Sequence, residues 1–193
     1  MKNIAIFVSG GGTDMQSVID ACQRGEINGK IRAVIANKSG IYAIDRAVKH
    51  GIPYRIFTIK EYGDAESRDK AIADYLSSLD IDLIVLAGYL SIVTSSLLDI
   101  YEGRIINIHP SLIPAYCGMG MYGMRVHRAV IEGGETESGC TVHYVDGGAD
   151  TGKIIEQAKV KVLAGDTPES LQERVLEQEH ILLPKVVAQL CRE

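Results

Sequence analysis

The stretch best suited to chemistry is Ile105–Pro114, where an asparagine and a histidine follow an apolar run. Ile105, Ile106 and Ile108 supply β-branched bulk and predict a buried strand. Pro110 cannot donate to a sheet ladder, so we expect the strand to end at His109. Asn107 and His109 then leave one face of the strand. An amide donor beside a protonatable imidazole suits a developing oxyanion, although two polar residues can also simply cap a strand end.

A second polar segment, Ser9–Asp14, follows the apolar run Ile4–Val8 and precedes apolar residues at helical spacing. A glycine loop between a strand and a helix lets backbone N–H groups approach a phosphate. The third glycine of a dinucleotide fingerprint is missing and no Gly-Lys-Ser/Thr follows, which favours a monophosphate over a dinucleotide or ATP. The alternative is a tight turn in which Thr13 or Asp14 caps the helix.

A third set of polar residues is the loop 146–152, between the strand 140–145 and its expected hairpin partner 153–162. A carboxylate from this loop could orient an imidazole and stabilise its protonated form. Asp146 and Asp150 are both eligible, and unconnected loop acids are the alternative. No serine or cysteine is marked as a nucleophile, which favours direct attack by a substrate amine.

The remaining patterns alternate between strands and helices, which predicts βαβ units and a largely parallel sheet. Residues 115–125 read as an adaptable flap, and residues 88–93 as either core or the wall of a flat ligand pocket. Thr167 should cap a long helix in which Pro184 introduces a kink or break. Further strands are expected at 31–36, 54–57 and 82–87, further helices at 41–50, 65–79 and 126–132, and inward-facing residues of the last helix at Leu171, Val175, Leu176, Ile181 and Leu182.

The composition is that of an ordinary globular protein, with 193 residues, 46% hydrophobic and 23% charged. The net charge of -5 argues against a nucleic-acid-binding surface. No apolar run reaches membrane-spanning length and no signal-peptide pattern is present. The four cysteines lack CxxC spacing, which favours reduced thiols, a cytoplasmic location and no metal site.

Across essentially the whole chain, the sequence resembles the phosphoribosylglycinamide formyltransferase family. The resemblance rests on six segments: Val8-Ser9-Gly10-Gly11-Gly12-Thr13-Asp14-Met15-Gln16, Leu86-Ala87-Gly88-Tyr89, Asn107-Ile108-His109-Pro110-Ser111-Leu112-Ile113-Pro114, His143-Tyr144-Val145, Asp150-Thr151-Gly152 and Gln178-Glu179-His180. It implies one α/β formyltransferase domain over 1–193. The expected fold is an open, mostly parallel mixed sheet flanked by helices, with a Rossmann-like N-terminal half, a C-terminal β-hairpin and a long helix.

The resemblance implies transfer of formyl from the co-substrate 10-formyltetrahydrofolate to the amino group of glycinamide ribonucleotide, in purine synthesis and without a metal. It places Asn107 and His109 at the oxyanion and Asp150 as the acid that holds His109 charged. The ribonucleotide side would comprise Gly11, Gly12, Thr13, Asp14 and Glu179. The folate side would comprise Arg68, Leu90, Ile92, Val93, Asn107, Asp146, Ala149 and Asp150.

The sequence departs from the family pattern at several positions. Ser91 replaces a frequent arginine and Cys117 a common proline, and the flap is longer than in the shortest members. Asp14 stands where asparagine is frequent, so we expect only its backbone N–H to face a phosphate. The resemblance also suggests a cis Ile113–Pro114 bond.

Three other functions fit parts of the pattern. A 10-formyltetrahydrofolate hydrolase would use the same triad with water, but the phosphate loop would have no role. Transfer to initiator methionyl-tRNA fits poorly with the acidic charge, and both of these enzyme types usually carry a further domain. A non-catalytic folate- or nucleotide-binding module would bind without turnover. No nucleic-acid or membrane partner is expected, and the protein is expected to be a monomer or homodimer.

Overall fold

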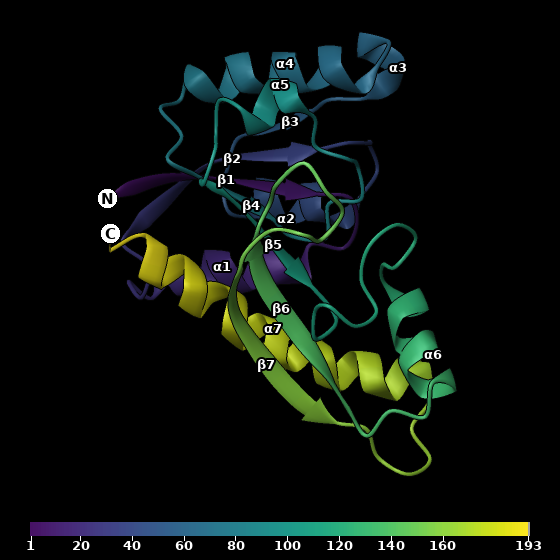
Figure 1. Ribbon diagram of the computed structural model, residues 1–193. Helices are drawn as coiled ribbons and strands as arrows, with labels where there is room; N and C mark the ends of the chain where they lie inside the picture. The colour runs from purple at the N-terminus through teal and green to yellow at the C-terminus, as the bar shows by residue number, and fades with distance from the viewer. Residues whose placement is uncertain (193) are drawn as a thin grey trace.

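A seven-stranded sheet in the order β3-β2-β1-β4-β5-β6-β7 runs through the computed structural model, which describes residues 1–192 (Figure 1). Neighbouring strands from β3 to β5 pair in parallel, whereas β5–β6 and β6–β7 are antiparallel. The predicted α/β class with a mixed, mostly parallel sheet and a C-terminal hairpin is therefore confirmed. The strands are β1 Lys2–Val8, β2 Gly29–Ala36, β3 Tyr54–Ile56, β4 Leu83–Leu86, β5 Ile105–His109, β6 Glu137–Tyr144 and β7 Ile154–Lys161.

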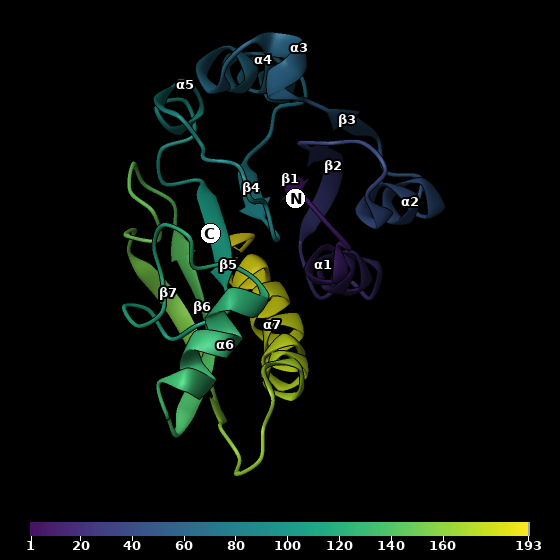
Figure 2. The same ribbon diagram turned by 90° about the vertical axis from the view of Figure 1, so that its right-hand side faces the viewer.

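Helices cover both faces of the sheet, as expected for parallel strands joined by crossovers (Figure 2). Helices α1, α2 and α7 pack on one face, and α4 and α5 on the other. The short helices α3 and α5 were not predicted, because one turn carries too little periodicity to detect. The helices are α1 Thr13–Gln23, α2 Tyr42–Lys49, α3 Ile59–Tyr62, α4 Ala65–Ser77, α5 Ser95–Leu98, α6 Met124–Glu132 and α7 Pro168–Leu190.

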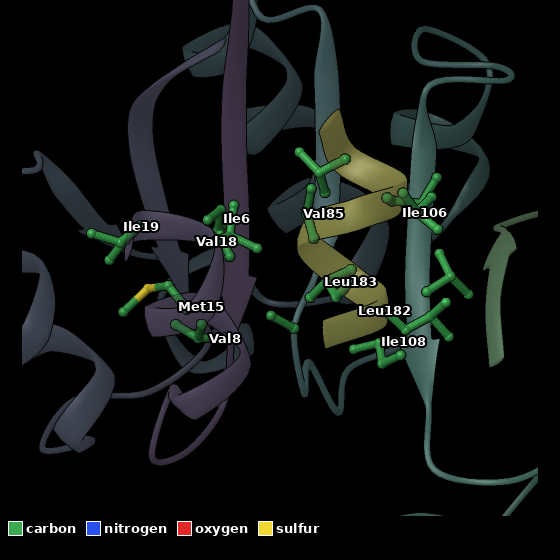
Figure 3. Packing of buried hydrophobic residues seen from close by; sticks show 14 of the residues in the cluster. Ile6, Val8, Met15, Val18, Ile19, Val85, Ile106, Ile108, Leu182 and Leu183 are labelled. Atoms are coloured by element: carbon green, nitrogen blue, oxygen red, sulfur yellow. The ribbon is translucent and has the colours of Figure 1, made fainter. Parts of the chain in front are cut away.

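The core beneath β1, β4 and β5 fixes the strands that carry the chemistry (Figure 3). Met15 and Val18 of α1 lie against β1, and Leu182 and Leu183 of α7 lie between β4 and β5; all four are at most 3% exposed. Burying each such side chain contributes about 1.5–3 kcal/mol. This packing holds the C-terminal ends of the strands in place, where Asn107 and His109 project.

For the last helix, a break at Pro184 and an inward-facing Ile181 are both contradicted by the structure. Helix α7 continues through Pro184, which is itself buried, and Ile181 is 62% exposed. Proline removes one backbone donor, but the buried neighbours Leu182, Leu183 and Val186 keep both halves on the sheet. The predicted start of the helix is confirmed. Thr167 Oγ1 accepts a hydrogen bond from the Ser170 N–H, and Ser170 Oγ accepts one from the Thr167 N–H.

Other expectations agree with the structure. The Ile113–Pro114 bond is cis. The flap segment 115–125 forms no regular structure until α6 begins at Met124, two residues earlier than the predicted helix. Within residues 1–192, no helix is long and apolar enough to cross a membrane.

Candidate active site

A cleft of about 750 Å³ opens at the carboxyl ends of β1, β4 and β5. Ligand sites of open α/β sheets occupy this position. Its walls include the glycine loop after β1, residues 86–93 after β4, the end of β5 with the flap, the loop 145–150, and one face of α7. The three polar segments identified in the sequence thus meet in one cleft.

His109, at the end of β5, is 4% exposed and has a protein group near each ring nitrogen. Its Nε2 lies 3.0 Å from the Tyr116 carbonyl oxygen, and its Nδ1 lies 3.6 Å from Asp150 Oδ2. A carbonyl can only accept, so this contact assigns a proton to Nε2. Nδ1 is therefore the nitrogen that can exchange a proton beside the carboxylate.

Asn107 lies opposite His143 in the antiparallel β5–β6 pair, and the two side chains touch. Asn107 Nδ2 is 3.1 Å from His143 Nε2, while His143 Nδ1 is 2.8 Å from the Tyr144 carbonyl oxygen. The carbonyl assigns the His143 proton to Nδ1, so Nε2 accepts from the amide. The amide nitrogen of Asn107, and not its oxygen, therefore faces His143. One N–H of that nitrogen binds His143, and the other is left for a ligand.

His143 was not predicted as a site residue. It stood in one of the family-like segments, but a histidine within an apolar strand gives no local sign of function. Only its pairing opposite Asn107 shows its role, and at 2% exposed it contacts no bulk solvent.

Asp150 is the carboxylate that the structure brings to the histidines. Its Oδ2 accepts from the Gly118 N–H at 2.9 Å, and its Oδ1 lies 3.6 Å from His143 Nε2. Burial acts to raise its pKa, but His143 and His109 in their protonated forms, together with the Gly118 N–H, outweigh this and hold the pKa below its ordinary value. Asp150 is therefore an anion that lies between the imidazoles of His109 and His143.

Asp146, the other eligible carboxylate, stabilises its own loop. It accepts from the Gly148 N–H at 3.0 Å and from the Thr151 hydroxyl at 2.6 Å. The Thr151 bond, followed by the Gly148 N–H, lowers its pKa. Asp146 lines the cleft but lies among exposed residues, so the structure separates two acids that the sequence could not.

The glycine loop forms the opposite end of the cleft. Gly12 is the N-cap of α1 in the left-handed region (φ 72°), and no side chain caps the helix. Neither Thr13 nor Asp14 is the cap that the turn alternative required. A Cβ on Gly12 would lie 2.7 Å from Ala43 Cβ, so only glycine fits there. The first-turn N–H groups of α1 are left for a ligand, the arrangement that binds phosphate.

Below this loop, α1 meets α7 in a group of three titratable side chains. Asp14 Oδ1 lies 3.7 Å from His180 Nε2, and neither atom has a hydrogen-bond partner among the described residues. Burial raises the pKa of Asp14 to about 7. Burial, and then the neighbouring Asp14, raises the pKa of Glu179. Asp14 and Glu179 both line the cleft.

On the expected folate side, Leu90, Ile92, Val93 and Ala149 line the cleft. Leu90 is 57% exposed and Ile92 is 67% exposed, so these two side chains belong to the wall of the cleft and not to the hydrophobic core. Tyr89, in contrast, packs edge-on against Phe7 in the core. Arg68 lies behind this wall. At 1% exposed it pairs with Asp69, and its Nη2 donates to the Ile92 carbonyl oxygen at 2.7 Å. Its contact with the cleft is therefore indirect.

Two further residues of the cleft wall were not predicted from the sequence. His127 of α6 is 2% exposed, and burial followed by His109 lowers its pKa to about 4. It is therefore neutral near pH 7. Gln172 lies on the cleft face of α7, two turns before Glu179. Among residues 1–192, no group of three His, Cys, Asp or Glu side chains is arranged to hold a metal ion.

The chain is similar to known proteins of one family. The Formyl transferase family profile matches residues 2–187. The chain is 44% identical to "Phosphoribosylglycinamide formyltransferase" of Haemophilus influenzae, covering 97% of this chain and 86% of that one. It is 37% identical to the Escherichia coli protein of the same name, covering 96% and 85%.

Solved structures show the same similarity. The glycinamide ribonucleotide transformylase 1 of Geobacillus kaustophilus superposes with a TM-score of 0.93 at 38% identity, covering 99% of each chain. That of Symbiobacterium toebii superposes with a TM-score of 0.94 at 37% identity, covering 100% of this chain and 88% of that one. The chain belongs to the formyl transferase family.

Proposed function

We propose that this protein is a phosphoribosylglycinamide formyltransferase, which transfers the formyl group of 10-formyltetrahydrofolate to the amino group of 5'-phosphoribosylglycinamide in purine biosynthesis. One observation carries the proposal. Asn107, His109 and Asp150 lie in the same cleft as an uncapped α1 N-terminus. Formyl-transfer chemistry and a phosphate-binding loop in one cleft fit an acceptor that carries both an amine and a phosphate.

The cleft would divide between the two substrates. The ribonucleotide phosphate would bind at Gly11, Gly12 and Thr13, and its ribose near Glu179. The folate would lie along Leu90, Ile92 and Val93, with Asp146 and Ala149 at its far side and Arg68 supporting the wall through the Ile92 carbonyl. These assignments follow the lining of the cleft and the family resemblance.

In the proposed reaction, the amine nitrogen attacks the formyl carbon and the carbonyl electrons move to oxygen. The free N–H of Asn107 and the Nδ1–H of protonated His109 would stabilise this oxyanion, while Asp150 balances the imidazolium charge. The amine loses a proton toward Asp150, the bond from the formyl carbon to folate N10 breaks, and N10 gains a proton. The products are formylated ribonucleotide and tetrahydrofolate.

The test is an assay for deformylated folate with purified protein and 10-formyltetrahydrofolate. Turnover that requires glycinamide ribonucleotide supports the transferase. Turnover with water alone would instead identify a hydrolase. Binding of both substrates without turnover would identify a binding module. The cytoplasmic location and the monomeric or homodimeric state stay predictions from the sequence.

A further inference from the structure

Backbone strain is concentrated on the two sides of His109. Within residues 1–192, only Asp80, Tyr116 and Asp150 have a positive φ without being glycine. Tyr116 (φ 51°) presents its carbonyl to His109 Nε2, and Asp150 (φ 57°) presents its carboxylate toward Nδ1. A non-glycine residue in this region is uncommon, and such strain persists only where surrounding structure enforces it.

The side chain of Tyr116 shows what enforces its conformation. Its hydroxyl donates to Glu135 Oε1 at 2.8 Å, in the turn between α6 and β6. The phenol also rests against Gly133, where an added Cβ would lie 2.3 Å from the hydroxyl oxygen. Gly133 has an ordinary helical φ of -71°, so the conformation there does not require glycine. What requires a small residue is the space taken by the phenol.

We infer that Tyr116 is a positioning residue for His109: its phenol, anchored by Glu135 and Gly133, holds the left-handed backbone that keeps the Tyr116 carbonyl on Nε2. The carbonyl confines the neutral imidazole to the Nε2–H form and leaves Nδ1 for the carboxylate and the formyl oxygen. If the anchor were lost, the carbonyl could rotate away and the imidazole could flip or take the Nδ1–H form. This inference rests on the proposed function only for its kinetic consequence.

Three variants remove the anchor without touching the cleft. Tyr116→Phe deletes the hydroxyl, Glu135→Ala deletes its acceptor, and Gly133→Ala places a methyl group where the phenol rests. Glu135→Gln keeps an acceptor and should restore the wild-type behaviour. Tyr42→Phe, at a 60% exposed tyrosine of α2, is the matched control for loss of a phenolic hydroxyl.

The first measurement needs no substrate. The chain has five histidines, so ¹⁵N spectra of histidine-labelled protein can be assigned with a His109→Asn reference. Neutral His109 should be in the Nε2–H form in wild-type protein, Glu135→Gln and Tyr42→Phe. The Nδ1–H form should appear in the three anchor variants. Unchanged His109 signals in those variants would overturn the inference, whatever the enzyme's substrate is.

The second measurement is steady-state kinetics of formyl transfer. Loss of one hydrogen bond of ordinary strength corresponds to roughly a three- to tenfold fall in kcat. KM for both substrates should change less than about twofold, because no contact to substrate is removed. The Tyr116→Phe/Glu135→Ala double variant should be no slower than either single variant, since both act on one contact. Additive losses, or a rise in KM with kcat intact, would also contradict the assignment.

Discussion

Two carboxylates, Asp150 and Asp14, face the same cleft from opposite ends, and each has a histidine nitrogen within 3.7 Å. Their side chains are similarly shielded, at 16% and 14% exposed. Yet the pKa of Asp150 lies below its ordinary value, whereas burial raises that of Asp14 to about 7. The difference lies in the partners. Asp150 receives a backbone N–H and faces two imidazoles, while Asp14 Oδ1 has no donor and Asp14 lies beside the acidic Glu179.

The histidines reinforce this contrast. Burial, and then Arg46, lowers the pKa of His180, so this neighbour supplies little positive charge to Asp14. The lesson is that burial alone does not set the charge of a carboxylate in this cleft; the donors aimed at it do. One end is therefore built to hold an anion beside a protonatable imidazole. At the other end, the raised pKa of Asp14 favours a protonated carboxyl group beneath the glycine loop, which is suited to bind phosphate.

The largest effect on kcat should come from removing the two groups that stabilise the oxyanion at the Asp150 end of the cleft. His109→Ala or Asn107→Ala should lower kcat by roughly two to four orders of magnitude, the scale of acid–base and oxyanion donors. Thermal unfolding should stay near wild type and serves as the control. Full turnover in either variant would remove the proposed chemistry from this end of the cleft.

Next in size is the effect of neutralising Asp150 itself. Asp150→Asn should cost roughly two orders of magnitude in kcat, because protonated His109 loses its counter-charge. Asp146→Asn is the matched control, since it removes one charge from the same loop, and it should cost less than about threefold. The reverse ranking in a formyl-transfer assay would show that the other carboxylate is the catalytic one.

At the glycine-loop end, Thr13→Asp should raise the ribonucleotide KM roughly tenfold, because a new negative charge near a phosphate costs about 1 kcal/mol or more. Thr13→Asn has a similar shape without the charge and should change KM far less. The folate KM should be unaffected in both. An equal ribonucleotide KM for both variants would show that the loop does not contact the phosphate.

The same contrast should also appear in the stability of the fold. Because the folded-state pKa of Asp14 is raised from 3.8 to about 7, its contribution to stability is full below about pH 4 and is lost as the pH rises toward 7. Asp14→Asn removes this loss, so it should stabilise the protein at pH 8 by about 4 kcal/mol, or roughly 10 °C in Tm, and by almost nothing at pH 4.

Thermal unfolding between pH 4 and pH 8 measures this difference. Asp45→Asn, at an exposed carboxylate of α2, is the control and should show no such trend. If Asp14→Asn gave the same Tm change at both pH values, Asp14 would already be ionised throughout. The contrast between the two ends of the cleft would then fail.

Much of the fold could be predicted from local pattern. The strand Ile105–His109, with its end set by Pro110, and the Thr167 start of α7 follow from proline geometry and capping. The break at Pro184 was predicted wrongly by the same reasoning, because the packing of Leu183 and Val186 on the sheet outweighs one missing hydrogen bond. Local rules work where neighbours in sequence decide the free energy, and fail where tertiary contacts do.

The sequence by itself determined the strand–loop–helix order, the pairing of Asn107 with His109 on one face, and the glycine loop after β1. Only the tertiary structure placed His143 against Asn107 and Arg68 behind the wall. It also brought Asp150 to His109, a partner that the family resemblance implied but that the residue pattern of the loop could not distinguish from Asp146. The physical reason is the separation in sequence between the residues that interact. Strand and helix patterns depend on residues a few positions apart, whereas hydrogen-bond partners and the desolvation that sets a carboxylate's charge depend on segments that meet only when the sheet forms.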